Sequence, residues 1–346
     1  MSSRSATLPG PARTGSGGTL LDVSDLTCEF PTRDGWRRVL DGVSLTVENG
    51  RTIGIVGESG SGKSMLTRAI LGLAPTSARV RGSVRLDGTE LTGLSRRSQR
   101  RILGRRMAVV FQDPMTALNP VVRIGRHLTE PMRFHLGLGR AESRARAAEL
   151  LDKVGIPDPE QKLRQYPHQL SGGMRQRVTI AAALSCDPEI LFADEATTAL
   201  DVTVQSQILD LLGDIQRERH MALVLISHDL GVISGRTDDV LVMYGGQLVE
   251  YAPTDRFFRD HRHRYSAALV ESIIRADHPR HGSFQTIPGS PPAPGAVPGC
   301  QFGPRCPAVT DECRSGRPPL VTVETDRRHR HRCLHPVDSP AEEMAP

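Results

Sequence analysis

A glycine-rich run between a short apolar segment and a helical pattern constrains this chain more than any other feature. The run GESGSGKS at residues 57–64 fits the pattern G-x-x-x-x-G-K-[ST]. It follows the apolar segment 52–56, which predicts a strand, and precedes the periodic segment 64–73, which predicts a helix. Strand, loop and helix in this order are the setting in which the pattern marks a phosphate-binding loop, or P-loop.

The chemistry of the loop follows from its residue types. Glycines let the backbone curl, so that successive N–H groups and the helix N-terminus face phosphate oxygens. Lys63 is expected to reach the β- and γ-phosphates of a nucleotide, and the Ser64 hydroxyl to ligate Mg²⁺. We therefore predict nucleotide binding by Gly57, Ser59, Gly60, Ser61, Gly62, Lys63 and Ser64.

Two adjacent carboxylates follow a second apolar segment. The segment 190–193 predicts a buried strand, and Asp194 and Glu195 come directly after it. The carboxyl ends of parallel strands meet at one sheet edge, so both side chains are expected beside the P-loop. Asp194 is predicted to hold Mg²⁺, directly or through water, and Glu195 to polarise the attacking water.

The remaining patterns predict an α/β fold. Segments 21–30 and 39–48 alternate apolar and polar residues, which is typical of antiparallel strands with one solvated face. Apolar runs at 189–193 and 222–226, each followed by a helix or loop, indicate a parallel sheet. Residues 120–169 are charged and rich in Ala, Leu and Arg, and 141–154 predicts an amphipathic helix, so this stretch is expected to be a helical insertion.

The run LSGGMRQ at 170–176 resembles the signature motif of the ATP-binding cassette (ABC) family. A serine and two glycines there would begin a helix whose N-terminus faces phosphate. The resemblance implies that this phosphate belongs to ATP held by the P-loop of a partner subunit, so that each site is shared across a dimer. It assigns to the nucleotide Ser171, Gly172, Gly173 and Gln176.

Further family elements occur in the order that the resemblance implies. Gln112, in FQDP, is similar to the Q-loop glutamine that touches Mg²⁺ or water and links the site to a membrane partner. Asp201, in ALD, resembles the D-loop aspartate, and His228, in SHD, the switch histidine that contacts the γ-phosphate. The predicted catalytic residues are then Gln112, Glu195 and His228. Phe30 is the expected adenine-stacking aromatic, and Trp36 is its rival.

The resemblance covers about residues 21–255 and implies a RecA-like P-loop NTPase cassette with an antiparallel β subdomain and a helical subdomain at about 113–187. The first 20 residues, rich in Ser, Gly, Pro and Thr, are expected to be a disordered tail, and 256–346 a loop-rich extension. Ala196 stands where the family usually has proline, but both carboxylates remain. Hydrolysis is therefore still expected.

Four of the six cysteines lie near the end of the sequence, at Cys300, Cys306, Cys313 and Cys333. In a cytosolic protein such crowding favours metal ligation over disulfides. The spacing C-x5-C-x6-C-x19-C matches neither a ferredoxin nor the close pairs of most zinc sites, so spacing does not choose between iron–sulfur, zinc and unligated thiols.

The segment from His263 to Cys333 resembles the C-terminal region of oligopeptide and dipeptide importer ATPases, of which a related branch carries nickel. The resemblance implies a [4Fe–4S] cluster held by the four cysteines. Arg264 stands where the family usually has proline.

Together these features predict an ATP-hydrolysing subunit of an ABC importer, with ATP and Mg²⁺ as ligands, that energises peptide uptake. The apolar stretches are shorter than the roughly 18 residues of a spanning helix, so separate subunits are expected to cross the membrane. The expected partners are a second ATPase subunit, homologous or identical, two permease subunits and an extracytoplasmic solute-binding protein. The chain is expected to lie peripherally on the cytoplasmic face of the membrane.

Three alternatives remain open at this point. The solute is not encoded in the chain, so a nickel or other small-solute importer is an alternative to a peptide importer. An exporter subunit is disfavoured by the importer-like tail. A soluble ABC ATPase acting on DNA or ribosomes would show a coiled-coil insertion or two cassettes, and arginines spread along the chain do not indicate nucleic-acid binding.

Overall fold

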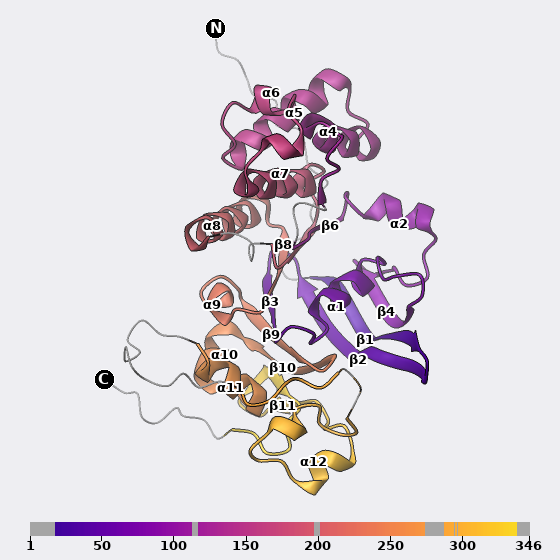
Figure 1. Cartoon of the computed structure of the whole chain (residues 1–346), viewed down its shortest axis with the longest axis vertical. Helices are drawn as coiled ribbons and strands as arrows, with labels where there is room; N and C mark the ends of the chain where they lie inside the picture. Colours follow the sequence, from indigo (N-terminus) through magenta and orange to yellow (C-terminus); the bar gives the residue numbers. More distant parts are fainter. Residues whose placement is uncertain are drawn as a thin grey trace, which may run out of the picture.

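The structure is a computed structural model that describes residues 18–112, 117–196, 201–273, 287–293, 295 and 297–337. Its parts follow one another along the long axis of the molecule (Figure 1). A helical layer lies at one end, two sheets occupy the middle, and the C-terminal extension lies at the other end. The predicted tail at 1–20 falls almost entirely outside the described residues.

The first sheet is antiparallel and has the strand order β2-β1-β4-β5. Its long strands β1 (Thr19–Thr32) and β2 (Gly35–Glu48) are those predicted from alternating residues, and β4 (Arg79–Leu86) and β5 (Thr89–Glu90) complete it. Leu21, Val23 and Leu26 of β1 are buried, while Ser24 and Asp25 are exposed. The antiparallel layer is thereby confirmed.

The second sheet has the order β11-β12-β10-β9-β3-β8-β7-β6. Five neighbouring strands in it are parallel: β6 (Met107–Val110), β7 (Ile190–Asp194), β8 (Ala222–Ser227), β3 (Thr52–Val56) and β9 (Asp239–Tyr244). Their residues are almost all buried, as expected of parallel strands covered on both faces. Helix α1 (Lys63–Ile70) packs between this sheet and the antiparallel one.

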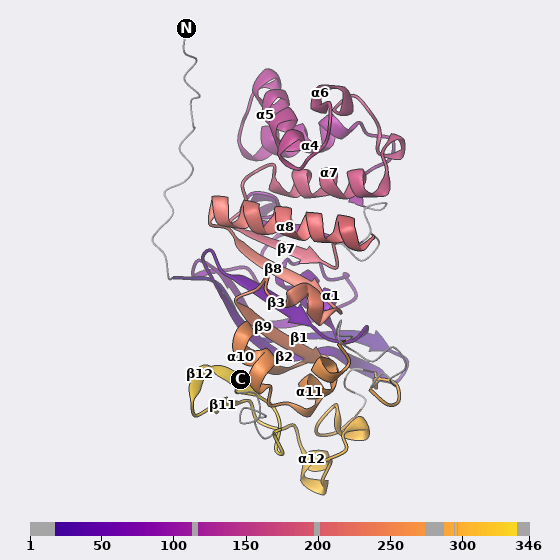
Figure 2. The same ribbon diagram turned by 90° about the vertical axis from the view of Figure 1, so that its left-hand side faces the viewer.

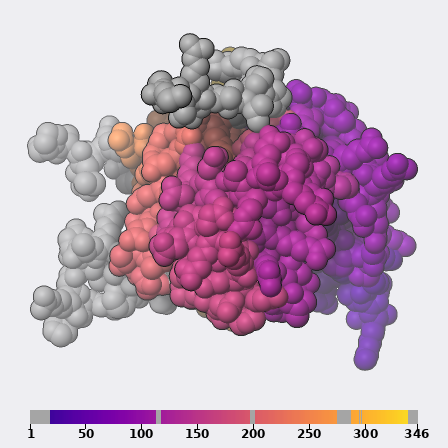
Figure 3. All heavy atoms as spheres, turned by 90° about the horizontal axis from the view of Figure 1, so that it is seen from above, coloured from indigo at the N-terminus to yellow at the C-terminus, as the bar shows by residue number. Residues whose placement is uncertain are grey.

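Helices cover the remaining sides of the parallel strands. Helix α8 (Val202–Arg219) runs alongside β7 and β8 (Figure 2), and the short α9 (Leu230–Ile233) follows β8. The helical layer consists of α4 (Ile124–His135), α5 (Arg140–Lys153), α6 (Pro159–Lys162), the 3₁₀ turn η1 (Pro167–Gln169) and α7 (Gly172–Leu184). It forms the face seen in Figure 3. The predicted helix at 141–154 is α5, and α2 (Arg96–Ile102) lies outside this layer.

The C-terminal extension is more regular than the loop-rich segment that the sequence predicts. It contains α10 (Thr254–Asp260), α11 (Arg264–Glu271), η2 (Gly303–Arg305), α12 (Asp311–Ser315), β11 (Val321–Val323) and β12 (Asp326–His331). Strand β12 pairs with β10 (Gln247–Pro253), so the extension continues the main sheet. Phe257, Tyr265 and Phe302 also join the main apolar core. The extension is therefore held partly by the core.

None of the helices in the described ranges combines the length and apolar character of a membrane-spanning segment.

Candidate nucleotide site

The loop between β3 and α1 has the strained, open backbone that its glycines allow. Gly57 has φ 153°, and a Cβ atom there would lie 2.2 Å from the carbonyl oxygen of Met243 in β9. Gly62, the residue before the first turn of α1, has φ 103°. Only glycine tolerates these conformations without cost, so the loop can curl around a small anion.

The Lys63 side chain is buried inside the loop. Its ammonium group donates hydrogen bonds to the carbonyl oxygens of Gly57 at 2.7 Å and Glu58 at 3.0 Å. Burial lowers the pKa of Lys63, although the carboxylates of Glu195, Asp194 and Glu58 act in the opposite direction. The positive charge of Lys63 therefore interacts favourably with the three nearby carboxylates.

Ser64 and Asp194 lie in contact, although they are 130 residues apart in the sequence. The Ser64 hydroxyl donates to a carboxylate oxygen of Asp194 at 3.0 Å. Asp194 is the last residue of β7, and burial raises the pKa of its carboxyl group. Hydroxyl and carboxylate oxygens are ligands that Mg²⁺ prefers, so these two side chains fit a magnesium ion.

Glu195 lies at the centre of a second group of predicted residues. Its backbone is left-handed, with φ 47°, and its N–H donates to the Ile226 carbonyl at 3.0 Å. The Gln112 amide donates to one oxygen of the carboxylate at 2.8 Å, and His228 Nδ1 lies 3.4 Å from the other. Gln112, Glu195 and His228 thus meet near the P-loop lysine, and the Glu195 carboxylate acts to raise the pKa of Lys63. Ala196, the departure from the family pattern, is buried and leaves both carboxylates in place.

The signature-like residues begin a helix in the other layer. The Ser171 hydroxyl accepts a hydrogen bond from the Met174 N–H and caps α7, while Asp201 caps α8 in the same way through Val204 N–H. A Cβ on Gly173 would touch the Val204 side chain at 3.4 Å, so the two helix starts are neighbours. Ser171, Gly172 and Asp201 are exposed.

Gln176 differs from the other residues assigned to the nucleotide. It is only 1% exposed, and its Nε2 has no hydrogen-bond partner within the described part of the chain. The side chain is therefore not accessible to a nucleotide in this structure. The rest of the FQDP and ALD motifs, at Asp113, Pro114, Ala199 and Leu200, lies outside the described residues.

The two aromatic candidates differ in exposure. Phe30 is half-buried and packs against the core beneath the antiparallel sheet. Trp36 is 42% exposed on the β1–β2 hairpin, and the Arg79 guanidinium carbon lies 3.5 Å from its ring centroid. The structure therefore leaves Trp36 the more accessible ring, although Arg79 already covers one of its faces.

The four C-terminal cysteines line one small cavity next to His263 and Phe302: Cys300, Cys306, Cys313 and Cys333. Burial raises the pKa of the Cys300 thiol to about 11 and also raises those of Cys306 and Cys333. Among the described side chains, no group of three or more His, Cys, Asp or Glu is arranged to hold a metal ion. The fold thus gathers the four thiols that were predicted to act together around one cavity.

Arg264, the second departure from the family pattern, lies beside this cavity. Its Nε donates to the His335 carbonyl at 2.9 Å and its Nη2 to the Pro336 carbonyl at 3.3 Å. The side chain therefore fastens the segment that follows Cys333 to the start of α11.

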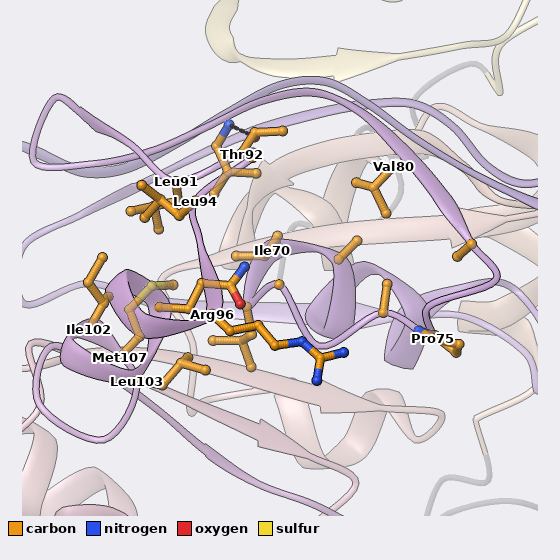
Figure 4. A pocket seen from close by; sticks show the side chains of 18 of the residues that line it. Ile70, Pro75, Val80, Leu91, Thr92, Leu94, Arg96, Ile102, Leu103 and Met107 are labelled. Atoms are coloured by element: carbon orange, nitrogen blue, oxygen red, sulfur yellow. Dashed lines mark hydrogen bonds between the residues drawn. The ribbon is translucent and has the colours of Figure 1, made fainter.

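A larger hollow lies away from all the predicted site residues (Figure 4). It has a volume of about 330 Å³ and lies between the end of α1, β4 and α2. Ile70, Leu91, Ile102 and Met107 give it an apolar lining, with Arg96 among the polar residues. No motif in the sequence marks it.

Two residues without any sequence-derived role contact the P-loop. The Tyr265 hydroxyl accepts a hydrogen bond from the Glu58 N–H at 2.7 Å, and Arg305 pairs with the Glu58 carboxylate. Both come from the C-terminal extension, more than 200 residues along the chain from Glu58. No local pattern could have indicated such contacts, because they depend on how α11 and η2 pack on the main sheet.

Comparison with known families matches two parts of the chain. Residues 40–198 match the ABC transporter family, and residues 249–313 match the oligopeptide/dipeptide transporter C-terminal region.

Curated relatives extend the likeness over most of the chain. The oligopeptide transport ATP-binding protein OppD of Salmonella typhimurium is 43% identical over 92% of this chain and 94% of its own length. The corresponding protein AppD of Bacillus subtilis is 44% identical, over 89% of this chain and 95% of its own. OppD of Mycobacterium tuberculosis is 47% identical over 91% of this chain, which spans only about half, 52%, of that longer relative.

Solved structures confirm the predicted fold class. An ATP-binding cassette solved as a dimer in a post-hydrolysis state with ADP and Pi aligns with 68% of this chain and 99% of its own, with a TM-score of 0.62 and 27% identity. The protein cbiO1 of Clostridium perfringens, part of an ABC transporter complex, aligns with 70% of this chain and 91% of its own, with a TM-score of 0.58 and 27% identity. The chain therefore belongs to the ABC transporter family of ATP-binding proteins, in the group that carries the oligopeptide/dipeptide transporter C-terminal region.

Proposed function

We propose that this protein hydrolyses ATP with Mg²⁺ and thereby energises the import of peptides across a membrane. The observation that carries the proposal is the convergence of Lys63, Asp194, Glu195, Gln112 and His228 around one loop. The names of the oligopeptide transport relatives support the choice of solute class.

Each residue around the loop has a distinct role in this proposal. The backbone of 57–64 and Lys63 hold the β- and γ-phosphates, while Ser64, Asp194 and Gln112 hold Mg²⁺, which when bound neutralises phosphate charge. Glu195 orients a water molecule and accepts its proton as the water oxygen attacks the γ-phosphorus and the bond to the β-phosphate oxygen breaks. His228 contacts the γ-phosphate. Phe30, with Trp36 as its rival, stacks on the adenine.

The start of α7 serves a second nucleotide in this proposal. Ser171 and Gly172 are exposed at a helix N-terminus, which favours an anion, but they belong to the helical layer. The related cassette with ADP and Pi was solved as a dimer. We therefore propose that two such subunits, identical or homologous, sandwich ATP between the P-loop of one and the Ser171, Gly172, Gly173, Gln176 and Asp201 region of the other.

We also propose a set of partners, which the family membership supports. Two permease subunits would receive the movement of the ATPase pair through the surface near Gln112 and the helical layer. A solute-binding protein on the far side of the membrane would deliver the peptide. The chain would then lie peripherally on the cytoplasmic face, organised as a cassette over 21–255, with its helical part at 113–187, and an extension over 256–346.

The four cysteines are proposed to hold a [4Fe–4S] cluster. The four cysteines line one cavity, which supports a ligand common to all of them. A bound cation would favour the thiolate form of Cys300, which burial disfavours. Protein purified without oxygen should be brown and contain iron and sulfide. Colourless protein with stoichiometric zinc would reject the cluster in favour of zinc, and protein without metal would reject both.

The ATPase proposal is tested on the purified full chain. Lys63→Ala should weaken ATP binding by at least about tenfold, because the loop loses the charge that meets the phosphates. Transport is tested by affinity capture from solubilised membranes. Recovery of permease subunits is the expected result, and recovery of ribosomes or DNA-repair factors without permeases would overturn it.

A further inference from the structure

The side chain of Arg305 in the C-terminal extension makes a two-point ion pair with Glu58 of the P-loop. Nη1 lies 2.6 Å from one carboxylate oxygen of Glu58, and Nη2 lies 3.1 Å from the other. The arginine side chain is 4% exposed and the glutamate side chain 26%. This pair is therefore largely shielded from solvent, unlike a typical surface ion pair.

Every N–H group of the Arg305 guanidinium has a partner. Besides Glu58, Nε donates to the Pro288 carbonyl at 2.7 Å, Nη2 to the Ile287 carbonyl at 3.1 Å and Nη1 to the Tyr244 hydroxyl at 3.2 Å. A guanidinium has five donors in a fixed plane, so this set of acceptors fixes both its position and its orientation.

Glu58 transmits this constraint to the phosphate-binding part of the loop. Its N–H is held by the Tyr265 hydroxyl at 2.7 Å, and its carbonyl accepts from the Lys63 ammonium at 3.0 Å. The Glu58 carboxylate also acts to raise the pKa of Lys63, because the two opposite charges attract each other. One residue thus connects a buried arginine of the extension with the lysine of the P-loop.

We propose that Arg305 is a positioning residue for the nucleotide site, which it serves by holding Glu58 and neutralising its charge. An unpaired carboxylate at this point of the loop would repel incoming phosphates and would be free to draw Lys63 away from them. This inference rests on the proposed role of residues 57–64 in binding ATP.

The position of Arg305 also connects the loop to the cysteine cavity. The residue ends the turn η2, whose N–H at Gly303 bonds to the Cys300 carbonyl at 2.9 Å, and Cys306 follows directly. Phe302 stands between them and packs against Tyr244 and Tyr265. The turn that carries Arg305 is therefore connected directly to Cys300, by a backbone hydrogen bond, and to Cys306, the next residue along the chain.

The test measures the dissociation constant of a fluorescent ATP analogue for the full chain and its variants. Arg305→Ala should raise the dissociation constant about five- to tenfold, because it leaves a negative charge beside the phosphates. Adding Glu58→Gln to Arg305→Ala should restore most of the affinity that Arg305→Ala loses, since the repelling charge is then gone. A purely structural arginine would show no such rescue.

Arg314→Ala is the matched control. Arg314 belongs to the same extension, pairs with Asp311 at 2.7 Å and is 62% exposed. Its loss should leave nucleotide affinity unchanged.

Three results separate the possible failures. Unchanged affinity in Arg305→Ala, or a double variant no better than Arg305→Ala, would overturn the inference. If Lys63→Ala also binds normally, the proposed nucleotide site itself is wrong. If Arg305→Ala does not fold, Arg305→Lys carries the test: it cannot make the two-point contact and should raise the dissociation constant about threefold, and wild-type affinity would overturn the inference.

Discussion

The side-chain amide of Gln112 donates a 2.8 Å hydrogen bond to the carboxylate of Glu195, which lies 83 residues further along the chain. His228 approaches the other oxygen of the same carboxylate at 3.4 Å. Glu195, which we propose to orient the attacking water, is therefore contacted on both carboxylate oxygens, by a residue that follows β6 and by a residue that follows β8. Such a group loses little freedom when it meets its substrate, which is the condition for effective general-base chemistry.

Replacing Glu195 with glutamine should separate binding from hydrolysis. The amide keeps the size of the carboxylate but cannot take the proton, so steady-state ATPase activity should fall about 10²- to 10³-fold. Affinity for ATP should stay within about twofold of the wild type, since Lys63 and the loop are unchanged. Size-exclusion chromatography with ATP should show a trapped dimer. Hydrolysis at a near-normal rate would assign the proton acceptor to another group.

Replacing Gly57 with alanine should damage the P-loop selectively. Its φ of 153° is unfavourable for alanine, and the new Cβ would lie 2.2 Å from a backbone oxygen of β9. We expect a loss of ATP affinity of at least about tenfold, because the displaced backbone N–H groups would no longer face the phosphate oxygens. Gly88→Ala is the control, because Gly88 also has a positive φ, 72°, but has nothing within 4 Å of a Cβ. Equal losses of affinity in the two variants would contradict the steric explanation.

Much of the fold and of the site could be predicted from local patterns. Alternating residues indicate β1 and β2, and the apolar run before the glycines indicates β3. The rule for strand ends places Asp194 beside the P-loop, where its carboxylate lies 3.0 Å from the Ser64 hydroxyl. These features depend on residues that lie close in sequence or on the general rule for the carboxyl ends of parallel strands.

The contacts of the extension could not be predicted in this way. Arg305 is one more arginine in a segment rich in proline and glycine. Its pairing with Glu58 exists only because Tyr265 of α11 and Phe302 next to η2 pack against Tyr244 at the end of β9. The burial of Gln176 has a similar cause, since it depends on which side of α7 faces the core. Long-range packing decides both, and no local pattern encodes it.

His263 should make stability depend on pH below neutrality. It is fully buried, which lowers its pKa to about 4, with Glu250 opposing the shift and His331 adding to it. Below its ordinary value of 6.5, an unfolded chain takes up a proton that the folded protein excludes. The free energy of unfolding should therefore fall as the pH drops from 6.5 towards 4, by up to about 1.4 kcal/mol per pH unit from this residue.

His263→Asn provides the comparison for that measurement. His263 caps α11 by accepting the Tyr265 N–H on its Nδ1, and asparagine can cap a helix in the same way. Urea unfolding at a series of pH values between 7 and 4.5 should show a shallower decline in the variant. An identical slope in both proteins would mean that other groups dominate the acid response.

Replacing Arg264 with the proline common in the family should loosen the segment after Cys333. Proline is tolerated at the first position of α11, so the helix should remain. The side-chain bonds to the carbonyls of His335 and Pro336 are lost, and so is the hydrogen bond from the backbone N–H of residue 264 to Cys333. Hydrogen exchange of residues 333–337 should become faster, while the free energy of global unfolding changes by less than about 1 kcal/mol. Arg264→Ala keeps the backbone N–H that bonds to Cys333 and removes only the side chain, so exchange should still become faster. Unaltered exchange in Arg264→Ala would remove this role from the side chain.

Strand β12 has a further consequence for the molecule as a whole. It pairs with β10 through Glu250 with His331 and Tyr251 with Arg330, and β10 is almost entirely buried beneath it. If the chain were cut after β10, this strand would offer its free N–H and C=O groups to any other polypeptide, the usual template for aggregation. By pairing with β10, the extension that carries the cysteines thus also prevents this strand from pairing with another polypeptide chain.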